Sequence, residues 1–81
     1  MLQLRPNCES CDRDLAPASC DAFICSFECT FCIDCADGKF GFTCPNCGGE
    51  LLRRPIRPEE KLRRFPASEK RIVKNHPPRE T

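Results

Sequence analysis

The order of apolar and polar positions predicts a short β-hairpin in the first half of the chain. An apolar run at 22–25 is followed by the turn-like residues 26–28 and then by a second apolar stretch around Thr30 and Phe31. Short apolar runs bounded by turn residues are typical of strands. We therefore predict two short strands that pair through this turn.

The next segment has the pattern of a short helix and then a further strand. Residues 32–37 can form one or two helical turns, and Gly38 can adopt the left-handed conformation that often ends a helix. Phe40 and Phe42 stand at positions i and i+2, so they would share one face of an extended segment. We predict a short strand at 40–43.

Beyond residue 52 the chain becomes polar, basic and rich in proline. Two segments, 58–64 and 68–74, each favour a helical turn, the second with Ser68 as its N-cap. Neither segment has enough apolar surface to be stable alone. We therefore expect a small domain at 1–52 and a basic, Pro-rich, mostly disordered tail at 53–81.

The composition leaves little apolar material for a core. The chain has 81 residues, with six Phe and neither Trp nor Tyr, and domains of this size are seldom stable through hydrophobic burial alone. Disulfides or bound metal stabilise many such scaffolds, and nine cysteines can serve for either. Residues 1–6 do not have the pattern of a signal peptide, and no stretch is long enough to span a membrane. We therefore expect a reducing cytoplasm, where paired cysteines bind metal.

Eight of the nine cysteines stand in four closely spaced pairs. The pairs are Cys8/Cys11, Cys25/Cys29, Cys32/Cys35 and Cys44/Cys47. Four thiolates in tetrahedral geometry form a closed structural zinc site, so eight thiols predict two zinc ions. Spacing leaves two groupings open. A sequential grouping unites neighbouring pairs, whereas an interleaved grouping unites the first pair with the third and the second with the fourth. The ninth cysteine, Cys20, is expected to be a spare thiol in the polar loop 12–21.

The last pair has the strongest local signature, in the sequence Cys44-Pro45-Asn46-Cys47-Gly48. Pro45 fixes φ for a tight turn, and Gly48 can take the positive φ that follows it. Backbone N–H groups of such a turn point at the first thiolate and spread its charge. We predict a metal-binding knuckle here. It suits zinc, and it also suits iron because rubredoxin-type sites use the same turn.

The order of the four pairs resembles that of a RING finger. Residues 29–35, Cys-Thr-Phe-Cys-Ile-Asp-Cys, are similar to the RING signature His-x-Phe-Cys-x-x-Cys with Cys29 in place of the His, and residues 44–47 resemble its closing Cys-Pro-x-Cys. The resemblance implies a treble-clef-type cross-brace with a short hairpin, one short helix and interleaved ligands. Its two zinc sites would be Cys8, Cys11, Cys32 and Cys35 (site 1) and Cys25, Cys29, Cys44 and Cys47 (site 2).

Three phrases of the sequence, at 4–8, 24–32 and 44–51, extend the resemblance over the whole cysteine-rich part. By these phrases the chain is identified as a member of an uncharacterised bacterial family of short cysteine-rich proteins, which has a domain of unknown function. Its bacterial relatives imply that the partner enzymes of RING ubiquitin ligases are absent. Ligase RINGs also usually place an apolar residue where this chain has Glu9, so a ligase-like module is the weakest of the possible functions.

The net charge of +1 conceals two oppositely charged parts of the chain. Residues 1–51 hold three basic against eight acidic residues, a balance of −5, whereas residues 52–81 hold ten basic against four acidic residues, a balance of +6. The basic tail makes nucleic-acid association the alternative function, because Lys and Arg contact phosphates. Its candidate contacts are Arg53, Arg54, Arg57, Lys61, Arg63, Arg64, Lys70, Arg71 and Lys74. However, Phe65 is the only aromatic residue among them, whereas surfaces that bind single-stranded nucleic acid interleave several aromatic and basic residues.

Enzymatic activity is not expected of this sequence. A zinc ion held by four thiolates has no open position for water, and the single histidine, His76, stands in the tail away from every cysteine pair. We predict a monomeric structural zinc protein that serves as a protein-interaction or scaffold module for an unidentified protein partner, with no membrane association. Phe31 is expected to pack between the two sites, and Phe27, at the tip of the hairpin, to be exposed.

Overall fold

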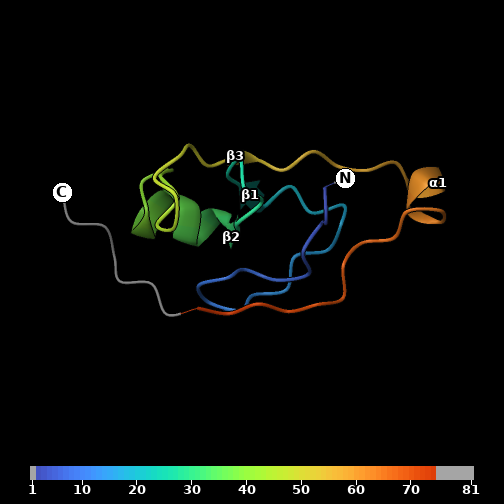
Figure 1. The fold of residues 1–81 in the computed structure, drawn as a ribbon, viewed down its shortest axis with the longest axis horizontal. Coiled ribbons are helices and arrows are strands. Elements are labelled where there is room, and N and C mark those ends of the chain that lie inside the picture. Colours follow the sequence, from blue (N-terminus) through green and yellow to red (C-terminus); the bar gives the residue numbers. More distant parts are fainter. Residues whose placement is uncertain (1, 75–81) are drawn as a thin grey trace.

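The computed structural model describes residues 2–74, which are built around a three-stranded antiparallel sheet with strand order β2-β1-β3 (Figure 1). Strand β1 (Ala22–Ile24) is central and pairs with β2 (Thr30–Cys32) on one edge. Strand β3 (Leu52–Arg53) pairs with β1 on the other edge. The short antiparallel sheet was expected, but its third strand comes from a different part of the chain than we predicted.

The hairpin between β1 and β2 forms as the sequence predicts. Cys25 N–H donates to the Cys29 carbonyl at 3.3 Å, and Glu28 N–H donates to the Cys25 carbonyl at 3.0 Å. Glu28 has a φ of +65°, which reverses the chain. Phe27 lies at the tip of this turn and is 72% exposed.

The helix after β2 is a π-helix, η1 (Cys35–Lys39), and it continues past the predicted end. Phe40 N–H donates to the Cys35 carbonyl at 3.0 Å, the i to i−5 bond of a π-turn. The left-handed glycine at its end is Gly41, with a φ of +57° and its N–H bonded to the Asp37 carbonyl at 3.2 Å. The prediction that Gly38 ends the helix is therefore wrong, because Gly38 lies inside it.

The strand predicted at 40–43 does not form. Gly41 and Phe42 both have left-handed φ values, +57° and +60°, which are incompatible with an extended segment. Only an isolated bridge between Thr43 and Glu50 remains. The two phenyl rings consequently separate: Phe40 is buried, whereas Phe42 is 40% exposed.

The core is small and combines apolar side chains with thiols. Its buried members are Cys8, Leu15, Ala22, Cys25, Phe31, Cys32, Ala36, Phe40, Cys44 and Leu51. At its centre Phe31 meets Phe40 edge to face, with ring centroids 5.0 Å apart. Because members of all four cysteine pairs contribute to or pack against this cluster, the cysteines and the core form one unit.

Residues 53–57 and 66–74 contact the cysteine-rich head (residues 2–52), whereas the sequence indicated a mostly disordered tail. Arg54 follows β3 and is 1% exposed, and its guanidinium donates to the backbone carbonyls of Arg5 at 2.8 Å and Ala16 at 3.0 Å. Helix α1 (Glu59–Leu62) begins after Pro58, within one of the two predicted helical segments. No helix in the described part of the chain is long and apolar enough to cross a membrane.

After α1 the chain turns back along the N-terminal arm, residues 2–7 (Figure 1). We call residues 66–74 the strap. Ser68 N–H donates to the Gln3 carbonyl at 2.9 Å, and the Asn7 side chain donates to the Ile72 carbonyl at 3.0 Å. No helix forms at 68–74, although the Ser68 hydroxyl accepts the Lys70 N–H at 3.2 Å, as the predicted N-cap would. The rest of the predicted tail, including His76, lies outside the described residues.

Candidate metal centre

Four thiols converge at the junction of the N-terminal loop with β2 and η1. The Sγ atoms of Cys8, Cys11, Cys32 and Cys35, which we call the first thiol group, all lie within 4.8 Å of one another. Cys11 Sγ and Cys32 Sγ are 3.6 Å apart. A disulfide is about 2.05 Å long, whereas a tetrahedron with Zn–S bonds of about 2.3 Å has edges of about 3.8 Å. The donor set therefore fits a tetrahedral thiolate-bound metal, and its members are those of the predicted site 1.

The loop that holds Cys8 and Cys11 is fixed by backbone hydrogen bonds. Cys8 N–H donates to the Arg13 carbonyl at 2.8 Å, and Asp12 N–H donates to the Cys8 carbonyl at 2.9 Å. Asp12 takes a φ of +63°, which closes the loop. Glu9 N–H donates to the Thr30 carbonyl at 2.8 Å and so ties the loop to β2, the strand that ends in the third ligand.

The thiols of the first group differ in how readily they ionise. Burial opposes ionisation of Cys8, but hydrogen bonds from the backbones of Cys11, Cys32 and Ser10 outweigh it and lower the pKa of this thiol. For Cys35, burial and the neighbouring Cys32 thiol raise the pKa well above its usual range. Since a metal binds the thiolate, Cys8 is the thiol of the two that is closer to its metal-binding form.

A second thiol group consists of Cys25, Cys44 and Cys47, whose Sγ atoms also lie within 4.8 Å of one another. The Cys44 turn has the predicted knuckle geometry. Gly48 has a φ of +77° and donates its N–H to the Cys44 carbonyl at 2.9 Å, while Asn46 N–H points at Cys44 Sγ at 3.4 Å.

Each thiol of the second group accepts a backbone N–H from the residue two positions later. Besides the contact at Cys44, Phe27 N–H donates to Cys25 Sγ at 3.3 Å and Gly49 N–H donates to Cys47 Sγ at 3.4 Å. These contacts favour thiolates, although burial raises the pKa of the Cys44 thiol to about 12 in the absence of metal. The sequence signal for the contact at Cys47 is Gly49, where a Cβ would meet Cys47 Sγ at 3.4 Å.

Cys29 is the remaining cysteine of predicted site 2. Among the described residues it does not belong to the second thiol group. Its Sγ accepts a hydrogen bond from Asn46 Nδ2 at 3.3 Å. Asn46 belongs to the Cys44 knuckle, so Cys29 lies beside the second thiol group. Cys20 is exposed and belongs to neither group, in keeping with a spare thiol.

Glu9 is a residue of the centre that the metal analysis of the sequence missed. It stands between Cys8 and Cys11, its side chain is 2% exposed, and its Oε2 accepts from Asn46 Nδ2 at 2.7 Å. Arg5 and Lys74 place cationic nitrogens 3.9 Å and 3.8 Å from its other oxygen. The signal that could have found it is a carboxylate in a position where RING fingers usually have an apolar side chain.

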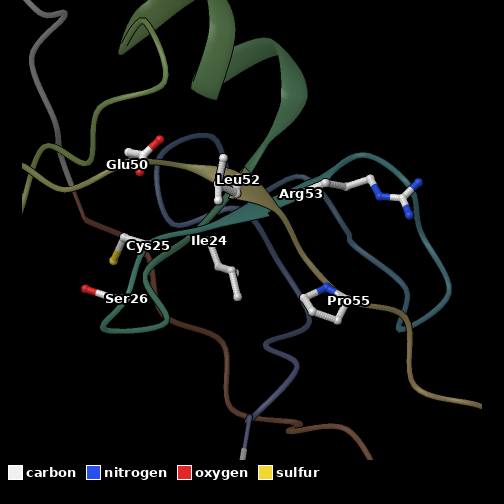
Figure 2. A pocket seen from close by; sticks show the side chains of 7 residues that line it. All are labelled: Ile24, Cys25, Ser26, Glu50, Leu52, Arg53 and Pro55. Carbon is white, nitrogen blue, oxygen red and sulfur yellow. The ribbon is translucent and has the colours of Figure 1, made fainter.

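A groove of about 470 Å³ lies beside the second thiol group, along the ends of β1 and β3. Its lining consists of Ile24, Cys25, Ser26, Glu50, Leu52, Arg53 and Pro55. Figure 2 shows Leu52 in the middle, with Glu50 and Arg53 on opposite sides of it. Leu52 is 61% exposed, which is unusual for a large apolar side chain on a strand.

A family model described as a protein of unknown function (DUF1272) matches residues 1–57. The chain belongs to this family. It is also similar to an uncharacterised protein of Rhizobium meliloti (strain 1021), with 66% identity over 74 residues that cover 91% of this chain and 88% of that protein. No solved structure matches. The bacterial family of unknown function inferred from the sequence is thus confirmed, whereas the RING-like fold and zinc stay predictions.

The DUF1272 match includes both thiol groups, β3 and Arg54, and it ends before α1 and the strap. Several of the basic residues proposed to contact phosphates bind this chain instead. Arg57 donates to the carbonyls of Leu2 and Phe65, and Arg71 pairs with Asp12 and Asp14 at 2.8 Å each. The charge available for a nucleic acid is therefore smaller than the sequence indicates, and nucleic-acid binding stays a prediction.

Proposed function

We propose that this DUF1272 protein is a structural zinc protein, in which two thiolate-bound ions hold together a small domain that binds a protein partner. The first thiol group carries the proposal. Four thiols from segments more than twenty residues apart converge within 4.8 Å. A shared metal ion or a pair of disulfides would stabilise that arrangement. The spacing of Cys11 Sγ and Cys32 Sγ, 3.6 Å, fits a metal better than a bond.

The small core supports the same conclusion. A structural zinc ion contributes about 10–16 kcal/mol of apparent binding free energy in small domains, whereas the net stability of a whole domain is about 5–15 kcal/mol. The ten buried core residues include four of the cysteines themselves. Without metal, these thiols would be poor substitutes for apolar side chains, so the domain should not fold.

Native mass spectrometry of freshly purified protein, followed by chelation, tests this proposal. We expect two zinc ions per chain, and we expect the chelated protein to lose its dispersed NMR spectrum and to regain it when zinc is added. Iron would be recognised by its mass and colour. A metal-free chain with a dispersed spectrum at neutral pH would refute the proposal.

We propose no catalytic role for either site. Four thiolates fill the coordination sphere of zinc and leave no place for a substrate or a reactive water. At the second thiol group, Cys29 would supply the fourth thiolate, since Asn46 already holds it beside the knuckle. The metal ions would therefore act on the fold rather than on a substrate.

The groove beside the second thiol group is the surface that supports a protein-interaction role. Its apolar middle is Leu52, with a carboxylate at Glu50 and a guanidinium at Arg53 on either side. A peptide with an apolar side chain between a basic and an acidic one would complement all three. We expect a synthetic peptide of this pattern to bind by fluorescence anisotropy and Leu52→Asp to abolish binding, with Leu62→Asp on α1 as the matched control. Binding that survives Leu52→Asp would exclude the groove.

A further inference from the structure

One hydrogen bond connects the two thiol groups through side chains. Asn46 of the Cys44 knuckle donates from Nδ2 to Glu9 Oε2 of the Cys8 loop at 2.7 Å. The same nitrogen donates to Cys29 Sγ at 3.3 Å. Because the amide nitrogen of Asn carries two hydrogens and both neighbours are acceptors, the Asn46 side chain bridges the carboxylate of Glu9 and the thiol of Cys29.

Both ends of this bridge are held in place. Glu9 donates its N–H to the Thr30 carbonyl at 2.8 Å and accepts the Lys74 N–H at its carbonyl, also at 2.8 Å. Asn46 donates its own N–H to Cys44 Sγ at 3.4 Å. A hydrogen bond to a carboxylate is about twice as strong as one between neutral groups. The contact between Glu9 and Asn46 is short and charge-assisted. A displacement of either loop would therefore move the other.

We propose that the Glu9–Asn46 hydrogen bond couples the two metal sites, so that metal in the first thiol group promotes binding at the second. The inference rests on the proposed structural zinc role. Metal bound by Cys8 and Cys11 fixes the loop that carries Glu9. Glu9 then orients Asn46, and Asn46 presents the Cys29 thiol beside Cys25, Cys44 and Cys47. By thermodynamic reciprocity, metal in the second group favours the first to the same degree.

The two residues act as positioning residues, since neither supplies a metal ligand. Outer partners of this kind typically change metal affinity about 10- to 100-fold when they are removed. We therefore expect the affinity of the second site to fall by about that factor in Glu9→Leu, which leaves no acceptor for Asn46 Nδ2, and in Asn46→Ala. The double variant should be little worse than either single variant, because both substitutions remove the same bridge.

Stepwise zinc addition to the metal-free full chain, followed by native mass spectrometry, tests the coupling. This measurement counts chains with zero, one and two ions. Wild-type protein should pass almost directly from zero to two, whereas both single variants should accumulate the one-ion form. Glu60→Leu, which removes an exposed carboxylate on α1, should behave as wild type. Because Asn46 is exposed, Asn46→Ala tests the bridge even if Glu9→Leu fails to fold.

The outcomes distinguish this inference from the proposed function. If wild-type protein takes up two ions but the variants show no more of the one-ion form, the coupling is refuted and the structural role remains. Strictly additive effects of the two substitutions would also refute it. If wild-type protein takes up no metal, both the coupling and the proposed function are refuted.

Discussion

The two thiol groups are supported in different ways: the distant strap contacts the loop of the first, whereas local turns contact the thiols of the second. Around the first group, the strap approaches from the far end of the chain: Lys74 N–H donates to the Glu9 carbonyl at 2.8 Å, and Arg71 pairs with Asp12. In the second group, backbone N–H groups two residues away contact every thiol, and Cys47 is exposed. The first group should therefore depend on the whole fold, whereas the second should depend mainly on its own turns.

The largest expected effect separates the two groups by removing one ligand from each. Cys8→Ser deletes a fully buried ligand at the centre of the core, and we expect it to lose both metal ions and the fold, since each ion contributes about 10–16 kcal/mol. Cys47→Ser deletes an exposed ligand, and we expect it to retain the ion of the first group. Native mass spectrometry and circular dichroism would show the difference. Equal losses in the two variants would contradict the comparison.

A smaller effect is expected at Arg54, which connects the backbone segments on either side of the Cys8 loop. Its guanidinium binds the carbonyls of Arg5 and Ala16, which lie on either side of the Cys8 loop. Arg54→Ala removes two hydrogen bonds made by a charged group, and we expect it to destabilise the protein by about 3 kcal/mol. Arg53→Ala, at the exposed neighbouring position, should change stability by less than about 0.5 kcal/mol.

Chelator-induced unfolding of the two variants would measure this difference. If metal is released faster from the first thiol group than from the second, Arg54 supports the first group, as the comparison predicts. Similar stability of Arg54→Ala and Arg53→Ala would show that the buried guanidinium is dispensable.

A weaker effect is expected from the ion pairs of the strap. Arg71 contacts Asp12 and Asp14 at the surface, and their carboxylates raise the pKa of Arg71. Screening by salt weakens such exposed pairs. We expect Arg71→Gln, like high salt, to speed hydrogen exchange at residues 8–14 and to leave residues 44–49 unchanged. Lys61→Gln on α1 is the control, and equal changes in both segments would argue against a local role of the strap.

The smallest effect is expected at Cys20. It is exposed and belongs to neither thiol group among residues 2–74. Cys20→Ser should therefore bind two metal ions with unchanged stability. A drop to one ion in native mass spectrometry would show that Cys20 replaces another ligand, and it would redefine the second site.

Local pattern was sufficient to predict the hairpin and the Cys44 knuckle. In the hairpin, two apolar segments and their turn lie within eleven residues, and the knuckle needs only five, including Gly48. Spacing alone could not choose between sequential and interleaved thiols, because both groupings satisfy four-coordinate geometry. The resemblance to RING fingers favoured the interleaved grouping, and the structure unites Cys8 and Cys11 with Cys32 and Cys35.

Features that depend on distant contacts were not visible in the sequence. Strand β3 has only two residues, so no alternation identifies it, and its partner β1 lies almost thirty residues earlier. Arg54 was assigned to the tail because the chain becomes basic and rich in proline beyond residue 52, yet it is buried and binds two backbone carbonyls. Helix η1 runs to Lys39 and is followed by the left-handed Gly41 because of its wider π-turn, for which the sequence has no marker.

The position of the strap also has a consequence for the order of events during synthesis. Every thiol of both groups precedes residue 48, whereas the strap begins at residue 66. Translation proceeds from the N-terminus, and domains fold as their segments emerge from the ribosome. The head, with the metal ions proposed for it, can thus close its core before the strap emerges. The strap then docks onto a finished surface, as the last step of folding rather than as its nucleus.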